Sequence, residues 1–371
     1  MSANGELAGK DRDRSDLCAI AASLPFTMSS QPPETKTARV TSFDVAERAG
    51  VNQSTVSRAL AGSPQVTPAT RERVLAVARE LGYTVDQRAS GLRTGRTDTV
   101  AVVILQGPED KAPSGNPFYF ELLGSICEAA SARGLETLVS LQSEEGRLSG
   151  DYVKRGQADG TIVIGSARHS AAWTYFQQLQ QTIGNLAFWG SPFDDARWVR
   201  SDNHGGGRIA TSHLLDRGYR KIAFVGPLGT GPGQFAERFA GYRDALAERG
   251  AQPIEASVYP DGDRSSQGYH AARDIIERDA TIDAFFVASD RLAFGVLDYL
   301  KEIGRNVPEE VGIVGFDGMS AGTICSPPLT TVAPDLGEAA EALLTMAIDG
   351  QASVTQRVTV NLIERASVRQ R

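Results

Sequence analysis

The sequence predicts an α plus α/β protein: a small helical unit followed by two lobes, each a parallel β-sheet covered by helices. Three observations predict this fold class. Residues 41–82 contain three short amphipathic segments, each preceded by a helix-capping residue. From residue 99 onward, short apolar segments alternate with amphipathic segments of about 10–15 residues, the pattern of parallel strands joined by crossover helices. This pattern covers about 270 residues, more than one such sheet usually takes, so two lobes are expected.

The segment from residue 40 to residue 60 has the layout of a helix-turn-helix. Thr41 is a good cap for a first helix, and Asp44 can return the hydrogen bond in a variant of the capping box. Gly50 can adopt the positive φ that ends this helix, and Asn52 caps a second one. The apolar stripe of the first helix is expected at Phe43, Ala46 and Ala49.

The second helix is expected to present small polar side chains to solvent. Val56 and Ala59 are expected to face inward. The side chains expected to point outward are Gln53, Ser54, Ser57 and Arg58. A slim polar helix of this kind suits the major groove of DNA. A third helix follows, capped by Thr67 with Pro68 at its first position. The alternative is an ordinary three-helix packing unit whose exposed polar residues bind nothing.

The strands and helices expected after residue 99 are assigned from apolar runs and amphipathic segments. Strands are expected at residues 100–105, 136–140, 160–164, 186–189, 222–225, 284–287, 311–314 and 358–364. Helices between them include residues 119–133, 206–217, 235–249 and 266–278. The proline-rich residues 327–331 are expected to cross between the lobes.

The composition argues against membrane, disulfide-linked and metal-binding proteins. No run of about 18 apolar residues is present, so no transmembrane helix is predicted and a cytoplasmic location is expected. Acidic residues precede the apolar segment 17–26, which disfavours an export signal there. The three cysteines are far apart and the four histidines lack metal-binding spacing, so no disulfide, metal or cofactor is predicted.

The net charge of −7 is divided unevenly along the chain. Between Arg39 and Thr97, nine arginines and no lysines stand against five acidic residues, a net charge of +4. The remainder of the chain therefore carries −11. A basic unit on an acidic body attracts phosphate through one face while limiting non-specific binding elsewhere.

The carboxyl ends of the predicted strands carry glycine, aspartate, serine and tryptophan, which suits a polar small molecule. The alternative is that these small residues only form tight turns. The loop at residues 226–233 lacks the G-K-[ST] ending of a phosphate-binding loop, and no catalytic triad signature is present. Asp194 and Asp195 are expected to be solvated loop charges, so an enzyme is not predicted.

The N-terminal pattern resembles the DNA-binding headpiece of the lactose/galactose repressor (LacI/GalR) family of bacterial transcription regulators. The similar runs are V-T-S-F-D-V-A-E-R-A-G-V-N-Q-S-T-V-S-R-A-L-A-G, V-T-P-A-T-R-E-R-V-L-A-V-A-R-E-L-G-Y and R-A-S-G-L-R-T-G-R-T. The resemblance spans residues 40–367 through runs such as A-D-G-T-I-V-I-G, E-R-F-A-G-Y-R-D-A-L and S-P-P-L-T-T-V. It implies a headpiece, a hinge helix and a two-lobed, periplasmic-binding-protein-like core that binds an effector between its lobes and forms dimers.

The resemblance divides the chain into four parts. A disordered N-terminal extension is expected over residues 1–38, within which Met28 is an alternative start. The helix-turn-helix domain is expected at residues 39–83, the linker and hinge helix at 84–97, and the core at 98–371. Lobe 1 is expected at residues 98–200 and 333–359, and lobe 2 at residues 201–331 and 360–371.

The expected DNA contacts follow from position on the second helix. Gln53 and Ser54 would read base edges in the major groove, and Arg58 could make a bidentate contact with guanine. The residues expected to hold phosphates and set the register are Thr41, Asn52, Thr55 and Ser57. One headpiece covers only a half-site, so a homodimer on near-palindromic operator DNA is expected.

Residues 86–94 resemble the hinge helix of the family. Leu92 matches the leucine that wedges into the minor groove at the operator centre, with Ala89 beside it. Gly91 inside so short a helix costs about 0.5–1 kcal/mol relative to Ala, so the hinge is expected to fold only on DNA. Val85 replaces the proline common before this segment. The alternative is a simple flexible linker.

The resemblance also implies a set of effector contacts. Arg238 and Asp317 match the charged contacts usual in the family. The first-lobe and cleft positions that match are Phe118, Tyr119, Trp189 and Ser289. Arg264 stands where family members often have an aromatic side chain that stacks on the ligand, a departure that argues against simple sugar stacking there.

The function expected from these observations is that of a dimeric repressor of a catabolic operon. A small molecule, best assigned as a carbohydrate, would control its affinity for the operator. A purine- or nucleoside-responsive regulator of the same architecture is the alternative, and a pure small-molecule binding protein is a more distant one. The sequence leaves open the operator, the effector's identity and whether the effector releases or strengthens DNA binding.

Overall fold

The computed structural model describes residues 40–83, 95–107, 116–143, 146–165, 170–228, 233–257, 262–350 and 355–370. The chain divides into two compact units, Met1–Val85 and Asp86–Arg371. The expected N-terminal extension and the expected hinge residues Ala89 and Leu92 lie outside the described residues. Among the helices that the structure describes, none combines the length and the apolar character needed to pass through a lipid bilayer.

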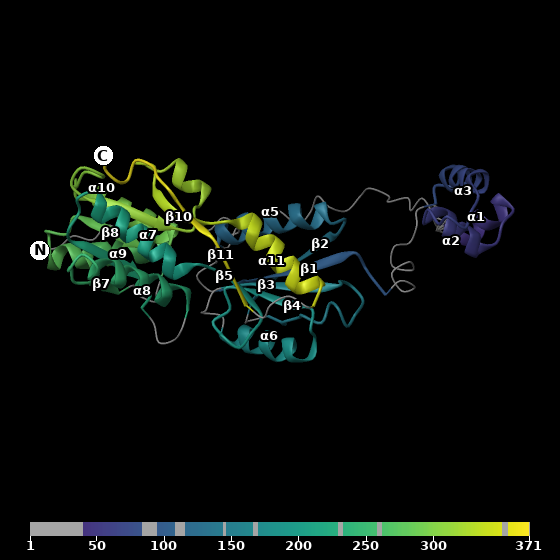
Figure 1. Ribbon diagram of the computed structural model, residues 1–371, viewed down its shortest axis with the longest axis horizontal. Coiled ribbons are helices and arrows are strands. Elements are labelled where there is room, and N and C mark those ends of the chain that lie inside the picture. The colour runs from purple at the N-terminus through teal and green to yellow at the C-terminus, as the bar shows by residue number, and fades with distance from the viewer. Residues whose placement is uncertain are drawn as a thin grey trace, which may run out of the picture. The chain divides into compact units, whose positions relative to one another are not determined.

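The first unit packs three helices around a small apolar core (Figure 1). Its helices are α1 (Ser42–Ala49), α2 (Gln53–Leu60) and α3 (Pro68–Glu80). The three predicted caps are confirmed, because Thr41, Asn52 and Thr67 each accept a hydrogen bond from the backbone N–H three residues on. Asp44 completes the capping box at Thr41, and Gly50 ends α1 with a φ of 65°.

One predicted core residue of α1 is wrong. Phe43 is 71% exposed, whereas Val45 is fully buried beside Ala46 and Ala49. At about 100° per residue, Phe43 lies roughly 110° around the helix from the centre of this buried stripe, so its ring faces away from the core.

The second unit contains two six-stranded sheets in its described residues. Sheet A has the order β11-β5-β4-β3-β1-β2, and its paired strands are all parallel. Its strands are β1 (Thr99–Gln106), β2 (Glu136–Ser143), β3 (Gly160–Ile164), β4 (Leu186–Trp189), β5 (Trp198–Ser201) and β11 (Thr355–Val358). Helices α5 (Pro117–Ala132) and α11 (Leu336–Ile348) cover one face, and α6 (Ser170–Thr182) covers the other (Figure 1). Sheet A and these helices are lobe 1.

Sheet B has the order β12-β10-β9-β8-β6-β7, with β10 and β12 antiparallel and the other pairs parallel. Its strands are β6 (Ile222–Gly226), β7 (Ile254–Ser257), β8 (Ala284–Val287), β9 (Gly312–Phe316), β10 (Thr330–Pro334) and β12 (Val360–Ile363). The helices α7 (Asn203–Asp216) and α8 (Gln234–Ala247) pack as one pair, and α9 (Arg264–Arg278) and α10 (Asp290–Glu302) pack as another. Sheet B and these four helices are lobe 2, which also carries the short 3-10 helix η2 (Ser320–Thr323).

Three segments connect the lobes: β5 to α7, β10 to α11, and β11 to β12 through Thr359. Backbone hydrogen bonds hold these crossings together. Asp202 N donates to Val358 O at 2.9 Å, and Asp335 N donates to Thr359 O at 3.0 Å. The Glu338 carboxylate accepts from Thr359 N at 2.9 Å. The three crossings therefore form one connected hinge region.

The single strand predicted at residues 358–364 is wrong, because the structure forms two strands there. Val358 pairs with Ser201 in sheet A, whereas Val360 pairs with Pro334 in sheet B. The break at Thr359 depends on partners in different sheets, so the local apolar pattern does not reveal it. The structure also contains β5, β7 and β10, which the sequence patterns do not predict as strands, while the other predicted strands are confirmed.

Candidate DNA-binding surface and effector site

The outward face of α2 carries the residues predicted to read DNA. Val56 and Ala59 are buried in the core of the first unit, which turns the opposite side of α2 to solvent. Ser54 and Arg58 are exposed there, and Gln53 is half-buried. The residues predicted to contact phosphates are exposed (Thr41, Asn52) or half-buried (Thr55, Ser57).

The first turn of α2 is a connected group of hydrogen bonds. Asn52 Oδ1 accepts from Thr55 N and Thr55 Oγ1, both at 2.7 Å, and from Ser54 Oγ at 2.8 Å. Gln53 Nε2 donates to Ser42 Oγ of α1 at 3.3 Å. These bonds orient the polar side chains at the start of α2, which lowers the entropic cost of ordering them in a complex.

Arg58 differs from the nearby arginines in its surroundings. Arg48 pairs with Glu80 at 2.7 Å, which raises the pKa of Arg48, and Arg71 donates to Ser63 O at 2.6 Å. Both side chains therefore serve contacts within the unit. Arg58 is exposed, and no hydrogen bond or ion pair of its side chain is found within the described part of the chain. Its planar, always-charged guanidinium is the one on α2 with the geometry for bidentate recognition.

The predicted charged effector contacts lie together at the carboxyl end of sheet B. Arg238 of α8 is 4% exposed, and its Nη1 lies 3.3 Å from Asp317 Oδ1. The same guanidinium donates to Ala288 O at 2.5 Å and to Asn203 Oδ1 at 3.0 Å, and it lies 3.5 Å from the centroid of the Phe316 ring. Burial lowers the pKa of Arg238, and attraction to Asp317 opposes that shift. Four contacts therefore fix the position of the Arg238 guanidinium.

Asp317 follows directly after β9 with a φ of 119°, an uncommon backbone conformation for a residue with a side chain. Burial raises the pKa of its carboxyl group to about 6, against the lowering effects of Arg238 and Arg264. Burial, and then the charge of Asp317, also raises the pKa of Asp290, which accepts hydrogen bonds from Thr331 Oγ1 at 2.6 Å and Met319 N at 2.7 Å. A strained, buried carboxyl group of this kind is typical of ligand sites.

Arg264 and Ser289 lie at the starts of helices in the same lobe. Arg264 begins α9, is 8% exposed and donates to Gln267 Oε1 at 3.1 Å. The guanidinium groups of Arg238 and Arg264 lie 5.3 and 5.6 Å from the ring of Phe235. Ser289 caps α10 through its hydroxyl, which accepts from Leu292 N at 3.4 Å. The structure therefore brings Arg264 and Arg238 to the same aromatic ring.

The predicted lobe 1 contacts form an aromatic group. The ring centroids of Phe118 and Trp189 are 6.0 Å apart, and those of Phe118 and Tyr119 are 6.2 Å apart. Met319 of lobe 2, two residues after Asp317, packs into the same apolar cluster as Phe118 and Trp189. The predicted effector residues of the two lobes therefore lie on either side of a direct contact between the lobes.

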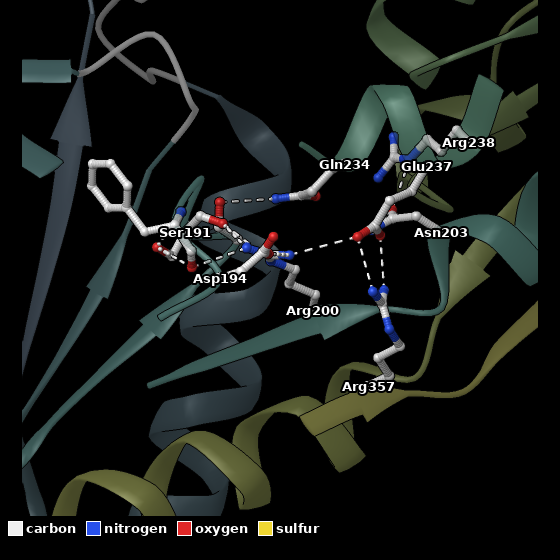
Figure 2. A network of polar contacts seen from close by, with 10 residues as sticks. Ser191, Asp194, Arg200, Asn203, Gln234, Glu237, Arg238 and Arg357 are labelled. Carbon is white, nitrogen blue, oxygen red and sulfur yellow. Dashed lines mark hydrogen bonds and ion pairs between the residues drawn. The ribbon is translucent and has the colours of Figure 1, made fainter. Parts of the chain in front are cut away.

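Several polar residues at this contact were not predicted from the sequence. Figure 2 shows Arg200 and Arg357 of lobe 1 reaching toward Glu237 of lobe 2. Asp194 is an exposed loop residue, as expected, and it also accepts a hydrogen bond at 2.8 Å from the buried Arg200. Asp195 likewise accepts from the Gln177 side chain at 2.9 Å. The one signal in the sequence was the placement of Glu237 directly before Arg238.

Comparison with known proteins identifies the family to which this chain is related. Residues 43–86 match the model described as "Bacterial regulatory proteins, lacI family", and residues 211–368 match that described as "Periplasmic binding protein-like domain". The HTH-type transcriptional regulator CelR of Thermobifida fusca is 35% identical over 296 residues, covering 78% of this chain and 85% of that protein. The chain belongs to the LacI family.

Other LacI-family proteins support the same assignment. Catabolite control protein A of Priestia megaterium is 32% identical over 316 residues, covering 82% of this chain and 92% of that protein. A solved CelR–cellobiose complex matches with a TM-score of 0.60 and 30% identity, over 89% of this chain and all of that one. A lac repressor dimer bound to operator and the anti-inducer ONPF matches in fold, with a TM-score of 0.70, 24% identity, and 88% and 98% of the two chains covered. This LacI-family chain is a DNA-binding transcription regulator with the two-sheet α/β core expected from its sequence.

Proposed function

We propose that this protein is a dimeric repressor of a catabolic operon whose affinity for a near-palindromic operator is controlled by a carbohydrate bound between its two lobes. The observation that carries the proposal is the Arg238–Asp317 pair, which lies at the carboxyl end of sheet B beside the lobe contact. Ligands of open α/β sheets bind at such strand ends.

The chemistry of these side chains suits a sugar. Each sugar hydroxyl both donates and accepts hydrogen bonds, so it can donate to the Asp317 carboxylate while it accepts from Arg238. Charged groups give stronger hydrogen bonds than neutral ones, and opening of the lobes would present the buried aromatic group of Phe118, Tyr119 and Trp189 to sugar C–H groups. Among relatives, CelR is found in a complex with cellobiose, and a LacI-family regulator from Arthrobacter, 25% identical with a TM-score of 0.59, is found in a complex with lactose.

On DNA, we assign base reading to Gln53, Ser54 and Arg58. The hydrogen-bonded first turn of α2 and the exposed guanidinium of Arg58 support this assignment. The phosphate contacts are assigned to Thr41, Asn52, Thr55 and Ser57. In the hinge, Ala89 and Leu92 remain predictions from resemblance to the family, with Leu92 as the minor-groove wedge.

The alternative effector is a purine or nucleoside. It is kept because the HTH-type transcriptional repressor PurR of Erwinia tasmaniensis is 29% identical over 341 residues, covering 88% of this chain. Two arginines close to aromatic rings, as at Arg238 and Arg264, would suit a planar heterocycle as well as a sugar.

A thermal-shift and operator-binding series separates these candidates. The purified protein is heated with cellobiose, lactose, ribose, guanine or guanosine, each at a range of concentrations. A ligand present at 100 times its Kd should stabilise the folded core by about 2.7 kcal/mol. The same ligand should change operator affinity in a gel-shift assay, whereas Asp317→Ala should keep operator binding and lose this response. Failure of every carbohydrate to change both readouts, with a response to guanine or guanosine, would replace the sugar by the alternative.

A further inference from the structure

Glu237 of α8 belongs to lobe 2, but its carboxylate is bound by two arginines of lobe 1. Arg357 of β11 makes a bidentate contact with it, Nη1 to Oε2 at 2.8 Å and Nη2 to Oε1 at 2.9 Å. Arg200 of β5 lies 3.5 Å from the same carboxylate. Burial acts to raise the pKa of Glu237, but hydrogen bonds from Arg357 and Asn203 outweigh it, so the pKa is lowered and the group is ionised at neutral pH.

Arg200 is fixed within lobe 1, and Arg357 lies beside it with its side chain 44% exposed. Arg200 is 2% exposed and donates to Ser191 O at 2.6 Å and to Phe193 O at 3.2 Å. Its guanidinium lies 4.0 Å from the ring of Trp198, and that of Arg357 lies 5.4 Å from the same ring. Because these contacts leave the buried Arg200 little freedom, it cannot follow Glu237 if the lobes move apart.

Asn203 connects Glu237 to the candidate effector site. This fully buried residue donates from Nδ2 to Glu237 Oε2 at 3.0 Å and accepts on Oδ1 from Arg238 Nε at 3.0 Å. Arg238 in turn pairs with Asp317. A continuous polar path therefore runs from Asp317 through Arg238, Asn203 and Glu237 to the edge strand of sheet A, and Figure 2 shows it from Arg238 onward.

Close packing of α7 against α8 fixes Asn203 relative to Glu237 and Arg238. Helices α7 and α8 cross at Gly207 and Gly241, where a Cβ atom would collide with the backbone of Arg238 and of His204. This close approach places Asn203, at the start of α7, beside Glu237 and Arg238 of α8. The link between them is thus part of a rigid helix pair rather than of a loop.

We propose that Glu237 is the positioning residue that couples the effector site to the contact between the lobes. It clamps lobe 2 onto Arg357 and Arg200, and through Asn203 it fixes the guanidinium that meets the effector. A ligand that moves Arg238 therefore changes the contact between the lobes through the Glu237 side chain. By linkage, the state of that contact changes the affinity for the ligand. The role of Glu237 in effector coupling rests on the proposed function. The contact of Glu237 with Arg357 and Arg200, here called the clamp, does not.

A second lobe contact, which does not involve Glu237, Arg200 or Arg357, reports on the clamp without any ligand. Ser320 of η2 in lobe 2 donates from its backbone N at 3.1 Å and from Oγ at 2.7 Å to Glu121 Oε1 of α5 in lobe 1. Separation of the lobes breaks these bonds and exposes the Ser320 amide to exchange with solvent. Hydrogen–deuterium exchange of the peptide that contains Ser320 therefore measures opening of the lobes.

The test compares Glu237→Gln with the matched control Glu248→Gln in the full-length protein. Glu248 ends the same helix and pairs with Arg208 at 2.7 Å, but both partners belong to lobe 2. Loss of charge-assisted hydrogen bonds across the lobes should raise the exchange rate at Ser320 about tenfold in Glu237→Gln. Glu248→Gln should leave that rate at the wild-type value. Wild-type exchange in Glu237→Gln, or an equal rise throughout both lobes, would overturn the clamp.

Arg357→Gln removes the other partner from a half-exposed position and serves if Glu237→Gln does not fold. It should give the same local rise at Ser320, and wild-type exchange in it would equally overturn the clamp.

The coupling is tested by the ratio of operator Kd values with and without cellobiose, or whichever probe in the screen acts on the wild type. That ratio should move toward 1 in Glu237→Gln and stay unchanged in Glu248→Gln, and an unchanged ratio in Glu237→Gln would overturn the coupling. If no probe acts on the wild type, the proposed function fails while the exchange result still decides the clamp.

Discussion

Replacement of Asp317 by asparagine should remove a pH-dependent destabilisation of the core. Burial raises the pKa of the Asp317 carboxyl group from an ordinary 3.8 to about 6. A carboxyl group whose pKa is higher in the folded than in the unfolded protein favours the folded state at low pH. The folded state therefore loses stability as the pH rises from the unfolded to the folded pKa, and the full loss is present above about pH 6.

The magnitude follows from the shift. A pKa difference of about two units corresponds to about 3 kcal/mol, of which about 2 kcal/mol develops between pH 4.5 and pH 7.5. Asparagine keeps the size and part of the hydrogen bonding of Asp317 but cannot ionise, so its variant lacks this term. The free energy of unfolding of Asp317→Asn minus that of the wild type should rise by about 2 kcal/mol over this pH interval.

Urea unfolding followed by tryptophan fluorescence measures this difference. The three tryptophans are Trp173, Trp189 and Trp198, so the signal reports on the unit that contains Asp317 and not on the first unit. The attraction of Arg238 for ionised Asp317 is already contained in the folded pKa, and the difference between asparagine and the protonated carboxyl group sets a pH-independent offset. A difference that stays constant from pH 4.5 to pH 7.5, or falls, would refute the assignment of a raised pKa to Asp317.

Three further substitutions test the DNA-binding parts of the argument. Arg58→Ala should weaken operator binding by about 1–3 kcal/mol and relax the preference at one base pair, as measured by gel shifts on an operator and its single-base variants; an unchanged base preference would exclude direct reading by Arg58. Leu92→Ala should weaken operator binding strongly while effector affinity, measured by calorimetry, stays almost constant, and equal operator affinity would remove its role as a wedge. Gly50→Ala, at a φ of 65°, should destabilise the first unit by about 1–2 kcal/mol in thermal unfolding of the isolated operator-free protein followed by circular dichroism, whereas an unchanged transition would show that the turn tolerates a side chain.

The sequence predicted the first unit well because its signals are local. A cap and its acceptor lie within three residues, as at Thr41 and Asn52, so the start of each helix can be assigned without knowledge of the tertiary structure. Phe43 was misplaced because the apolar stripe was judged from spacing alone, without the angle of each residue around the helix. The strand ends that carry Trp189 and Asp317 were predictable for a related reason, since a buried parallel strand is a short apolar run with a polar end.

The clamp between the lobes was not predictable in this way. Arg200, Glu237 and Arg357 are charged residues far apart in the sequence, and a lone charged residue in a sequence is most simply assigned to solvent. Only the pairing of β11 with β5 brings Arg357 beside Arg200, and only the crossing of α7 and α8 brings Glu237 to them. Non-local pairing of strands and helices therefore decides which charges meet, just as it splits the predicted C-terminal strand at Thr359.

The adjacent strands β11 and β12 also order events during synthesis of the protein. They are consecutive in the chain, yet they supply one edge strand each to two different sheets. On the ribosome, neither lobe can complete its sheet until residues 355–363 have emerged, however early its other strands were made. A nonsense codon shortly before residue 355 would therefore remove one edge strand from each sheet and expose β5 and β10, a state prone to aggregation and proteolysis, rather than releasing one finished lobe.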